Sequence, residues 1–365
     1  MSAERATILT ELVAEEGLDQ LLVGDLVRPG DSGPDAIANI RWLTGFTGTS
    51  GFAVVGDGAA VFLTDFRYVE RAEHEVGESF ERVIAQGRLL PELAGRLSGR
   101  VGFDDAATSV RSLRKLTEEV GDGVELVPAG GLVERLRRRK DPAEQEGLAE
   151  AARLADDAYR AVLERGLSGR TELEVARAAE ARIRELGGEP AFPAIVGAGE
   201  NGALPHAEPG ERAIRAGDLV VWDMGAKLDG LCSDCTRTFA VGEIEEEARE
   251  VYELVLSAQA ASLEAIRPGL GGADADEVAR AIIRDAGHGE AFGHGLGHGV
   301  GLEVHEAPRL GMRSEDTLAE GDAVTVEPGV YVPGRFGVRI EDLAIVTDDG
   351  HRNLSSLPKE LQVVE

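Results

Sequence analysis

The sequence predicts an α+β protein of two domains: a small α/β domain over residues 1–136, followed by a larger domain over residues 137–365 with a curved, mostly antiparallel sheet. Three observations support this prediction. A chain of 365 residues has room for roughly two domains. Short apolar runs alternate with helical stretches in its first part, and pairs of strands separated by long helices follow in its second part.

The first domain is predicted from alternating strand and helix signals. In order, these are a helix over 4–16, a strand over 19–23, a loop over 27–36, strands over 52–55 and 60–63, a helix from residue 67, a strand over 101–103, a helix near 109–119 and a strand near 124–127. The loop is inferred from its Gly, Pro and Asp content. Gly56-Asp57-Gly58 separates two apolar runs, which is typical of a β-hairpin.

The domain boundary is predicted at a basic run, residues 137–140, which leads into a helix start. Asp141 is a good N-cap, the proline after it suits the first helical position, and Glu144 lies near the positive end of the helix dipole. Thr171 and Glu174 form the pattern of a capping box at the start of a second helix. The predicted helices of this domain cover about 141–165, 171–186, 245–266 and 275–286, and the predicted strand pairs are 219–224 with 231–239 and 323–332 with 338–346.

Composition excludes several classes of protein. The net charge is −29, from 67 acidic and 38 basic residues, and this field opposes binding to nucleic acid. No apolar run approaches ~18 residues, so no membrane span is expected. The first residues lack the basic start and apolar core of a signal peptide. Two cysteines do not make a disulfide framework, and a cytoplasmic location is the simplest interpretation.

Four carboxylates, Asp223, Asp234, Glu327 and Glu341, lie in stretches predicted to be apolar strands. A hairpin across residues 229–230 would bring the two aspartates side by side. A carboxylate buried among Val, Trp and Leu is costly unless a cation neutralises it. His298 lies in a glycine-rich segment whose backbone can approach a ligand closely.

These five donors are more than one metal ion needs and suit two. A mostly oxygen donor set with one imidazole favours Mn²⁺, with Co²⁺, Fe²⁺ and Zn²⁺ as alternatives. Two such ions about 4 Å apart can activate water and polarise a carbonyl together, so the sequence predicts a two-metal hydrolase.

Five further residues invite a site interpretation. His206, His294 and His305 either hydrogen-bond or move protons at a substrate, or are structural histidines, and the residues alone leave both readings open. Cys232 and Cys235 form a C-x-x-C pattern, but residues three apart on a strand face opposite sides and no further zinc ligands lie nearby. A redox or zinc role for the cysteines is therefore rejected.

The motifs around these residues resemble one family. They are Leu-Pro-His-Ala at 204–207, Asp-Met-Gly at 223–225, Ser-Asp-Cys-Thr-Arg-Thr-Phe at 233–239, the segment 294–306, Glu-Pro-Gly-Val-Tyr at 327–331, Gly-Val-Arg-Ile-Glu-Asp at 337–342, and in the first domain the segments 39–48 and 64–68. They are similar to the proline-specific branch of the "pita-bread" metallopeptidases, the Xaa-Pro aminopeptidases and Xaa-Pro dipeptidases (prolidases). The resemblance covers nearly the whole chain and implies a pita-bread catalytic domain behind a creatinase/prolidase-like N-terminal domain.

The resemblance also implies a role for each site residue. Asp223 would bind one metal ion, His298 and Glu327 the other, and Asp234 and Glu341 would bridge both. Glu327 would also accept the proton of the attacking water. Substrate handling would fall to the three remaining histidines and to the arginine of the last motif: His206, His294, His305 and Arg339.

The implied activity is hydrolysis of the peptide bond before a proline at the second position of a short peptide, by a homodimeric exopeptidase. Three rivals are a creatinase-like hydrolase, a non-catalytic binding relative of the same fold, and a methionine aminopeptidase. The complete set of ligand types argues against the first two, and the large N-terminal domain and the paired histidines of 294–298 against the third. Aminopeptidase and dipeptidase activity remain open, because one sequence does not show how the site is closed beyond the proline.

Overall fold

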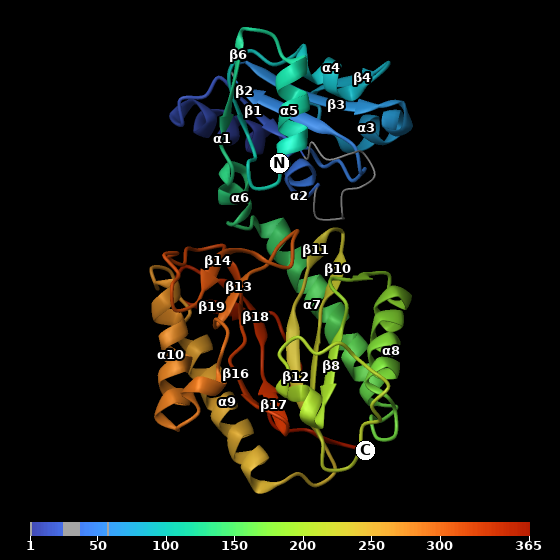
Figure 1. Ribbon diagram of the computed structural model, residues 1–365, viewed down its shortest axis with the longest axis vertical. Helices are drawn as coiled ribbons and strands as arrows, with labels where there is room; N and C mark the ends of the chain where they lie inside the picture. The colour runs from blue at the N-terminus through green and yellow to red at the C-terminus, as the bar shows by residue number, and fades with distance from the viewer. Residues whose placement is uncertain (1, 25–36, 57) are drawn as a thin grey trace. The chain divides into compact units, whose positions relative to one another are not determined.

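The computed structural model describes residues 2–24, 37–56 and 58–365 (Figure 1). The chain divides into two compact units, residues 1–137 and 138–365. The loop predicted over residues 27–36 lies outside the described residues.

Among the described residues, the first unit holds a six-stranded sheet in the order β4-β3-β2-β1-β5-β6. Its elements are α1 (Ser2–Glu15), β1 (Gln20–Val23), α2 (Ala38–Thr44), β2 (Phe52–Gly56), β3 (Ala59–Asp65), α3 (Val69–Glu75), β4 (Glu81–Ala85), α4 (Leu89–Ala94), β5 (Gly99–Phe103), α5 (Val110–Glu119), β6 (Val124–Pro128) and α6 (Leu132–Arg137). β2 runs antiparallel to its neighbours β1 and β3, whereas the pairs β1–β5, β5–β6 and β3–β4 are parallel. The sheet is therefore mixed, and a helix connects each parallel pair that is consecutive in the chain, α3 between β3 and β4 and α5 between β5 and β6.

The predicted strands of this unit are confirmed as β1, β2, β3, β5 and β6, and the predicted hairpin is the antiparallel pair β2–β3. The sequence did not indicate β4, α2, α4 or α6. β4 is an edge strand whose first residues, Glu81 and Arg82, are exposed. Such a strand lacks the alternation of apolar and polar residues from which strands are recognised.

The second unit contains two main sheets and two smaller ones. Its helices are α7 (Pro142–Leu163), α8 (Glu172–Glu185), α9 (Glu246–Ala265) and α10 (Gly272–Asp285). One main sheet has the order β20-β12-β9-β8, from β8 (Ile195–Ala198), β9 (Leu219–Met224), β12 (Cys235–Val241) and β20 (Val363–Val364). The other has the order β14-β13-β15-β18-β19, from β13 (Gly297–Gly299), β14 (Glu306–Leu310), β15 (Ala323–Val326), β18 (Asp342–Val346) and β19 (His351–Asn353). The smaller sheets are β11-β10-β7, from β7 (Glu189–Pro190), β10 (Ala226–Leu228) and β11 (Leu231–Cys232), and β16-β17, from β16 (Gly329–Val332) and β17 (Phe336–Arg339).

A pair of helices covers each main sheet. Side chains of α7 and α8 share an apolar core with β8, β9 and β12, in which Tyr159, Trp222 and Phe239 are fully buried. Side chains of α9 and α10 share a second core with β15, β17 and β18. Figure 1 shows α9 and α10 on one side of the strands and α8 on the other. The predicted N-cap at Asp141 and the predicted capping box at Thr171 are both present, and the structure adds that Asp141 forms a capping box with Glu144.

The predicted long strands are interrupted, and this corrects the sequence analysis. Residues 231–239 divide into β11 and β12, 323–332 into β15 and β16, and 338–346 into β17 and β18. Asp234, Glu327 and Glu341 each lie in the two-residue break between consecutive strands. At these breaks the chain passes from one sheet to another, so a side chain there faces the space between the sheets instead of alternating along one strand.

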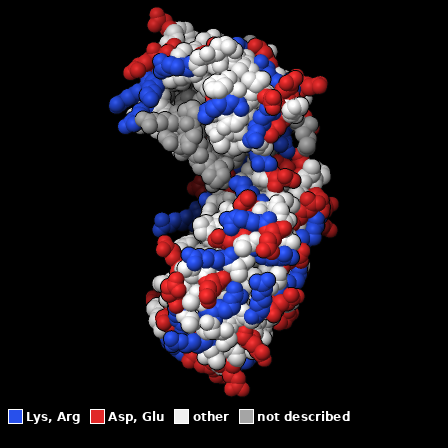
Figure 2. Space-filling model, turned by 90° about the vertical axis from the view of Figure 1, so that its right-hand side faces the viewer, with Lys and Arg blue, Asp and Glu red and all other residues white. Residues whose placement is uncertain are grey.

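Acidic and basic side chains are interspersed over the face of the second unit that Figure 2 presents. Among the described residues, no helix is long and apolar enough to cross a membrane. The expectation that the protein does not bind nucleic acid stays a prediction from its net charge of −29.

Candidate metal centre

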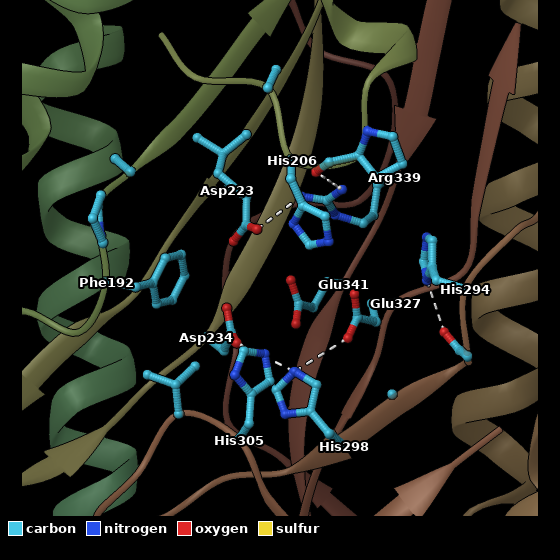
Figure 3. Close-up of a pocket in the computed structure, with 18 of the residues that line it drawn as sticks. Phe192, His206, Asp223, Asp234, His294, His298, His305, Glu327, Arg339 and Glu341 are labelled. Carbon is cyan, nitrogen blue, oxygen red and sulfur yellow. Dashed lines mark hydrogen bonds and ion pairs between the residues drawn. The ribbon is translucent and has the colours of Figure 1, made fainter. Parts of the chain in front are cut away.

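A cavity of about 610 Å³ opens in the second unit, between the two main sheets. All nine residues that the sequence analysis selected line it (Figure 3): Asp223, Asp234, His298, Glu327, Glu341, His206, His294, His305 and Arg339. Residues from β9, from the strand breaks and from the glycine-rich segment thus converge on one space, although up to 135 positions separate His206 from Glu341.

The centre of the cavity is a cluster of donor atoms. One atom each of Asp234, His298 and Glu341 lies within 4.8 Å of the other two. Nε2 of His298 is 3.3 Å from Oε1 of Glu327 and 3.7 Å from Oδ2 of Asp234. These separations bring His298, Asp234 and Glu341 within reach of a common cation, and they place Glu327 beside the imidazole.

The backbone fixes His298 in this cluster. A Cβ atom at Gly297 would overlap the carbonyl of Thr325, and one at Gly299 would overlap the carbonyl of Ala307, so both neighbours of His298 must be glycine. Nδ1 of His298 lies 3.1 Å from the carbonyl oxygen of Gly299, which can only accept a hydrogen bond. Nδ1 therefore carries the proton, and Nε2 is left to face the carboxylates.

Only one of the two carboxylate oxygens of Asp223 has a hydrogen-bond partner among the described residues. Nη2 of Arg339 donates to its Oδ2 at 2.8 Å, while its Oδ1 is buried and has no hydrogen-bond partner among the described residues. An unsatisfied buried carboxylate oxygen is costly. This oxygen lies in a cavity that the carboxylates of Asp234, Glu327 and Glu341 also line, so it is available to bind a cation.

Two polar residues that the sequence analysis missed hold this centre in place. Oγ1 of Thr236 donates to Oε2 of Glu341 at 2.6 Å and accepts from Nε of Arg339 at 3.0 Å. Nη1 of Arg339 donates to the hydroxyl of Tyr331 at 2.9 Å. Thr236 lies directly opposite Asp223 in the pairing of β12 with β9, and this cross-strand position is the signal that could have identified it.

Burial dominates the electrostatics of the cluster. It raises the pKa of Asp234 and Glu341 well above the usual range, and the charge of a neighbouring carboxylate adds to each shift. Burial also raises the pKa of Asp223, although the Arg339 guanidinium opposes the shift. For Glu327, burial is outweighed by the hydrogen bond and charge of His298, which lower its pKa to about 2. Burial thus disfavours ionisation of three of the four carboxylates, Asp223, Asp234 and Glu341.

The three further histidines differ in what they contact. His294 is engaged at both ring nitrogens, with Nδ1 2.8 Å from the carbonyl oxygen of Gly295 and Nε2 2.9 Å from the hydroxyl of Tyr331. Figure 3 shows it to one side of the carboxylates. Burial lowers the pKa of His294 and of His305, so both tend to be neutral. His206 and His305 are exposed to the cavity, and the ring of His305 packs on that of His298 with 4.3 Å between centroids.

Arg339 donates hydrogen bonds to several groups of the protein. Besides Asp223, Thr236 and Tyr331, it donates to the carbonyl oxygen of Pro205 at 3.0 Å. Its predicted role in binding substrate stays a prediction. The structure adds that it supports Asp223 and the segment that carries His206.

Comparison with known proteins shows to which family the chain belongs. Residues 146–348 match metallopeptidase family M24, and residues 5–139 match the Creatinase/Prolidase N-terminal domain. The chain belongs to metallopeptidase family M24. The resemblance and the α+β fold class predicted from the sequence are thereby confirmed.

Relatives of this M24 metallopeptidase match it over nearly their whole length. The Xaa-Pro dipeptidase of Pyrococcus furiosus is 34% identical over 98% of this chain and 99% of its own. A solved Xaa-Pro dipeptidase from Bacillus anthracis has a TM-score of 0.94 and 38% identity, and covers 100% of both chains. The X-Pro aminopeptidase from Thermotoga maritima has a TM-score of 0.88 and 32% identity, and covers 95% of this chain and 98% of its own.

The family implies divalent metal ions, and the residues of this chain fit them. The donor set is rich in carboxylate oxygen with one imidazole, three of its donors lie within 4.8 Å of one another, and Oδ1 of Asp223 is buried without a partner. This M24 metallopeptidase therefore has the side chains that a divalent-metal hydrolase requires.

Proposed function

We propose that the protein is a dinuclear metal-dependent exopeptidase that hydrolyses the bond between an N-terminal residue and proline. The observation that carries this proposal is the convergence of four carboxylates and one imidazole, drawn from separate strands and strand breaks, on a single cavity. The substrate class is supported by the Xaa-Pro peptidases among its relatives.

The proposed ligands divide between two ions. Asp223 would hold one ion, and His298 and Glu327 the other, with Asp234 and Glu341 bridging them. Mn²⁺ is the proposed metal because oxygen donors dominate, and Co²⁺, Fe²⁺ and Zn²⁺ are alternatives. When bound, the two ions supply Lewis-acid activation of the attacking water and of the scissile carbonyl.

The chain's own residues manage the protons and the developing charge. Glu327 accepts the proton of the attacking water, because its carboxylate lines the cavity and lies 3.3 Å from Nε2 of His298, beside the proposed metal ions. A neutral histidine donates to the carbonyl oxygen as that oxygen becomes negative. His305 fits this task better than His294, because Tyr331 and the carbonyl of Gly295 engage both ring nitrogens of His294. The proline nitrogen leaves after it is protonated.

The proposed partners are short peptides with proline at the second position. A free α-amine bound near the metal ligands would make the enzyme an exopeptidase, and His206 at the exposed side of the cavity would contact the rest of the peptide. A homodimer in the cytoplasm is the proposed state of the protein. Light scattering after gel filtration tests the dimer, which a molecular mass near 38.6 kDa would exclude.

The decisive test combines metal analysis with peptide hydrolysis. Purified protein is expected to bind about two divalent ions per chain, and the Mn²⁺-loaded protein to cleave an Xaa-Pro dipeptide, an Xaa-Pro-Yaa tripeptide or both. Comparing the two peptides separates dipeptidase from aminopeptidase activity. Protein that binds no stoichiometric metal and cleaves neither peptide after Mn²⁺ is added would refute the proposal.

Neutral variants of the two bridging carboxylates test the ligand assignment. Asp234→Asn and Glu341→Gln are each expected to abolish turnover and to lower the number of bound ions, with the fold retained by circular dichroism. Asp229→Asn is the matched control, because Asp229 is exposed in a turn at φ 47°, which asparagine also adopts. Near-normal activity in either bridging variant would exclude its ligand role.

A further inference from the structure

The basic run at residues 137–140 continues into the second unit, where its residues differ in how far they are exposed to solvent. Arg139 is exposed and donates from Nε to the carbonyl oxygen of Glu320. Lys140 is buried, with only 2% of its side chain exposed. A lysine is almost never buried this far unless it is paired.

The partner of Lys140 is Glu306, which directly follows His305. Nζ of Lys140 lies 3.1 Å from Oε2 of Glu306, whose side chain is 8% exposed, and also donates to the carbonyl oxygen of Arg138 at 3.1 Å. Both charges lie in a poorly solvated environment, where their attraction is screened little by water.

Glu306 in turn closes the turn that carries His305. Its Oε1 accepts from the backbone N–H of Glu303 at 3.0 Å, and the N–H of Gly301 donates to the carbonyl oxygen of Glu303 at 3.0 Å. A Cβ at Gly301 would come within 2.5 Å of the Glu306 carboxylate, so the turn packs closely over this group. The Glu306 carboxylate therefore holds the side of the turn that leads to His305, while the N–H of Cys232, which donates to the carbonyl oxygen of Gly301 at 2.8 Å, holds its start.

His305 depends on that path. Its ring packs on the ring of His298, and both histidines line the cavity with Val304. In the part of the chain that the structure describes, no side chain is seen to hydrogen-bond the ring nitrogens of His305. Its position consequently follows from the backbone of the turn and from one ring contact.

We propose that Lys140 is a positioning residue of the active site: its ammonium fixes Glu306, and through the 301–306 turn it sets the place of His305 in the cavity. Residues 138–140 thus connect the two units and also support the active site. The effect on catalysis rests on the proposed function, whereas the effect on the turn does not.

The first experiment compares Lys140→Met with Arg139→Met, a matched loss of a neighbouring positive charge. Hydrogen exchange measured by mass spectrometry is expected to become faster in the peptides that cover residues 301–306 in Lys140→Met, and to be unchanged there in Arg139→Met. This readout needs no activity. Equal exchange in the two variants and the wild type would overturn the inference, even if the protein proves not to be a peptidase.

The second experiment measures kcat and KM for an Xaa-Pro peptide. Displacement of a catalytic group by about 1 Å costs up to roughly 100-fold in rate. Lys140→Met is expected to lower kcat by about 10- to 100-fold with a much smaller change in KM, because a group that acts on the transition state is displaced. Arg139→Met is expected to leave both constants unchanged. Glu306→Gln, whose amide oxygen can still accept from Glu303, is expected to give a smaller loss in the same direction.

A lower fraction of folded protein would also lower kcat, and a double-mutant cycle removes this ambiguity. If Lys140 acts through His305, adding Lys140→Met to His305→Ala lowers kcat little further, because the two changes share one effect. A full additional loss in the double variant would show a merely structural role and overturn the proposal. A wild type that cleaves no Xaa-Pro peptide would instead refute the proposed function and leave the exchange result to decide about the turn.

Discussion

Thr236→Val tests whether a single hydroxyl prepares Glu341 to bind metal. Thr236 is fully buried, and its hydroxyl bonds to two charged groups, the Glu341 carboxylate at 2.6 Å and the Arg339 guanidinium at 3.0 Å. Valine has nearly the same shape as threonine but lacks the hydroxyl, so the hydrogen bonds to Glu341 and Arg339 are both lost. A hydrogen bond to a charged group contributes about 1.5–3 kcal/mol, so loss of the Glu341 bond alone corresponds to roughly 10- to 150-fold weaker metal binding. Titration calorimetry of metal-free protein with Mn²⁺ measures this change.

Thr238→Val is the matched control on the same strand. Thr238 is equally buried, but its hydroxyl bonds only to the backbone of Arg339, at 2.9 Å to the carbonyl oxygen and 3.1 Å from the N–H. Its loss is expected to lower the free energy of unfolding by about 1–3 kcal/mol and to change metal affinity little. If Thr236→Val binds Mn²⁺ as tightly as the wild type, or no more weakly than Thr238→Val, the reasoning about Glu341 is refuted.

Two further predictions concern stability. Arg237→Met is expected to lower the free energy of unfolding in urea by about 3–5 kcal/mol, because it leaves the fully buried Asp342 without the guanidinium that lies 2.7 Å away. Arg335→Met removes only exposed ion pairs and is expected to lower it by about 1 kcal/mol or less. Equal losses in the two variants would contradict this prediction. Removal of metal with a chelator is expected to lower the melting temperature, and Mn²⁺ at about 100 times its Kd to restore about 2.7 kcal/mol of stability. A melting temperature that chelation leaves unchanged would indicate that no metal stabilises the fold.

The identity of the site residues was accessible from the sequence because their chemistry is local. Four carboxylates in apolar surroundings and one histidine between glycines require an explanation wherever they lie in space. The structure brings all five into one cavity with His206, His294, His305 and Arg339. That they hold metal stays a prediction, although the unsatisfied Oδ1 of Asp223 favours it.

The arrangement around these residues was not accessible, because it depends on contacts between distant segments. The pattern of apolar residues predicted continuous strands, whereas Asp234, Glu327 and Glu341 lie in breaks between strands of different sheets. Periodicity reports burial and does not report which sheet a buried segment joins. The bond from Thr236 to Glu341 spans 105 positions, and no local pattern reveals it.

The strand breaks explain how one fold can bury so much charge. The backbone N–H of Glu341 donates to the carbonyl of Thr236 at 3.1 Å, and that of Glu327 donates to the carbonyl of Leu296 at 2.8 Å, so these two N–H groups keep a backbone hydrogen bond although they lie in strand breaks. The side chains, in contrast, face one another across the cavity, where burial raises the pKa of Asp234 and Glu341. The fold therefore keeps these two N–H groups paired without metal, whereas Oδ1 of Asp223 has no hydrogen-bond partner among the described residues. Bound cations neutralise these buried carboxylates, so metal binding is expected to stabilise the folded protein. Metal affinity and stability should therefore change together when Glu341 loses its hydrogen bond to Thr236.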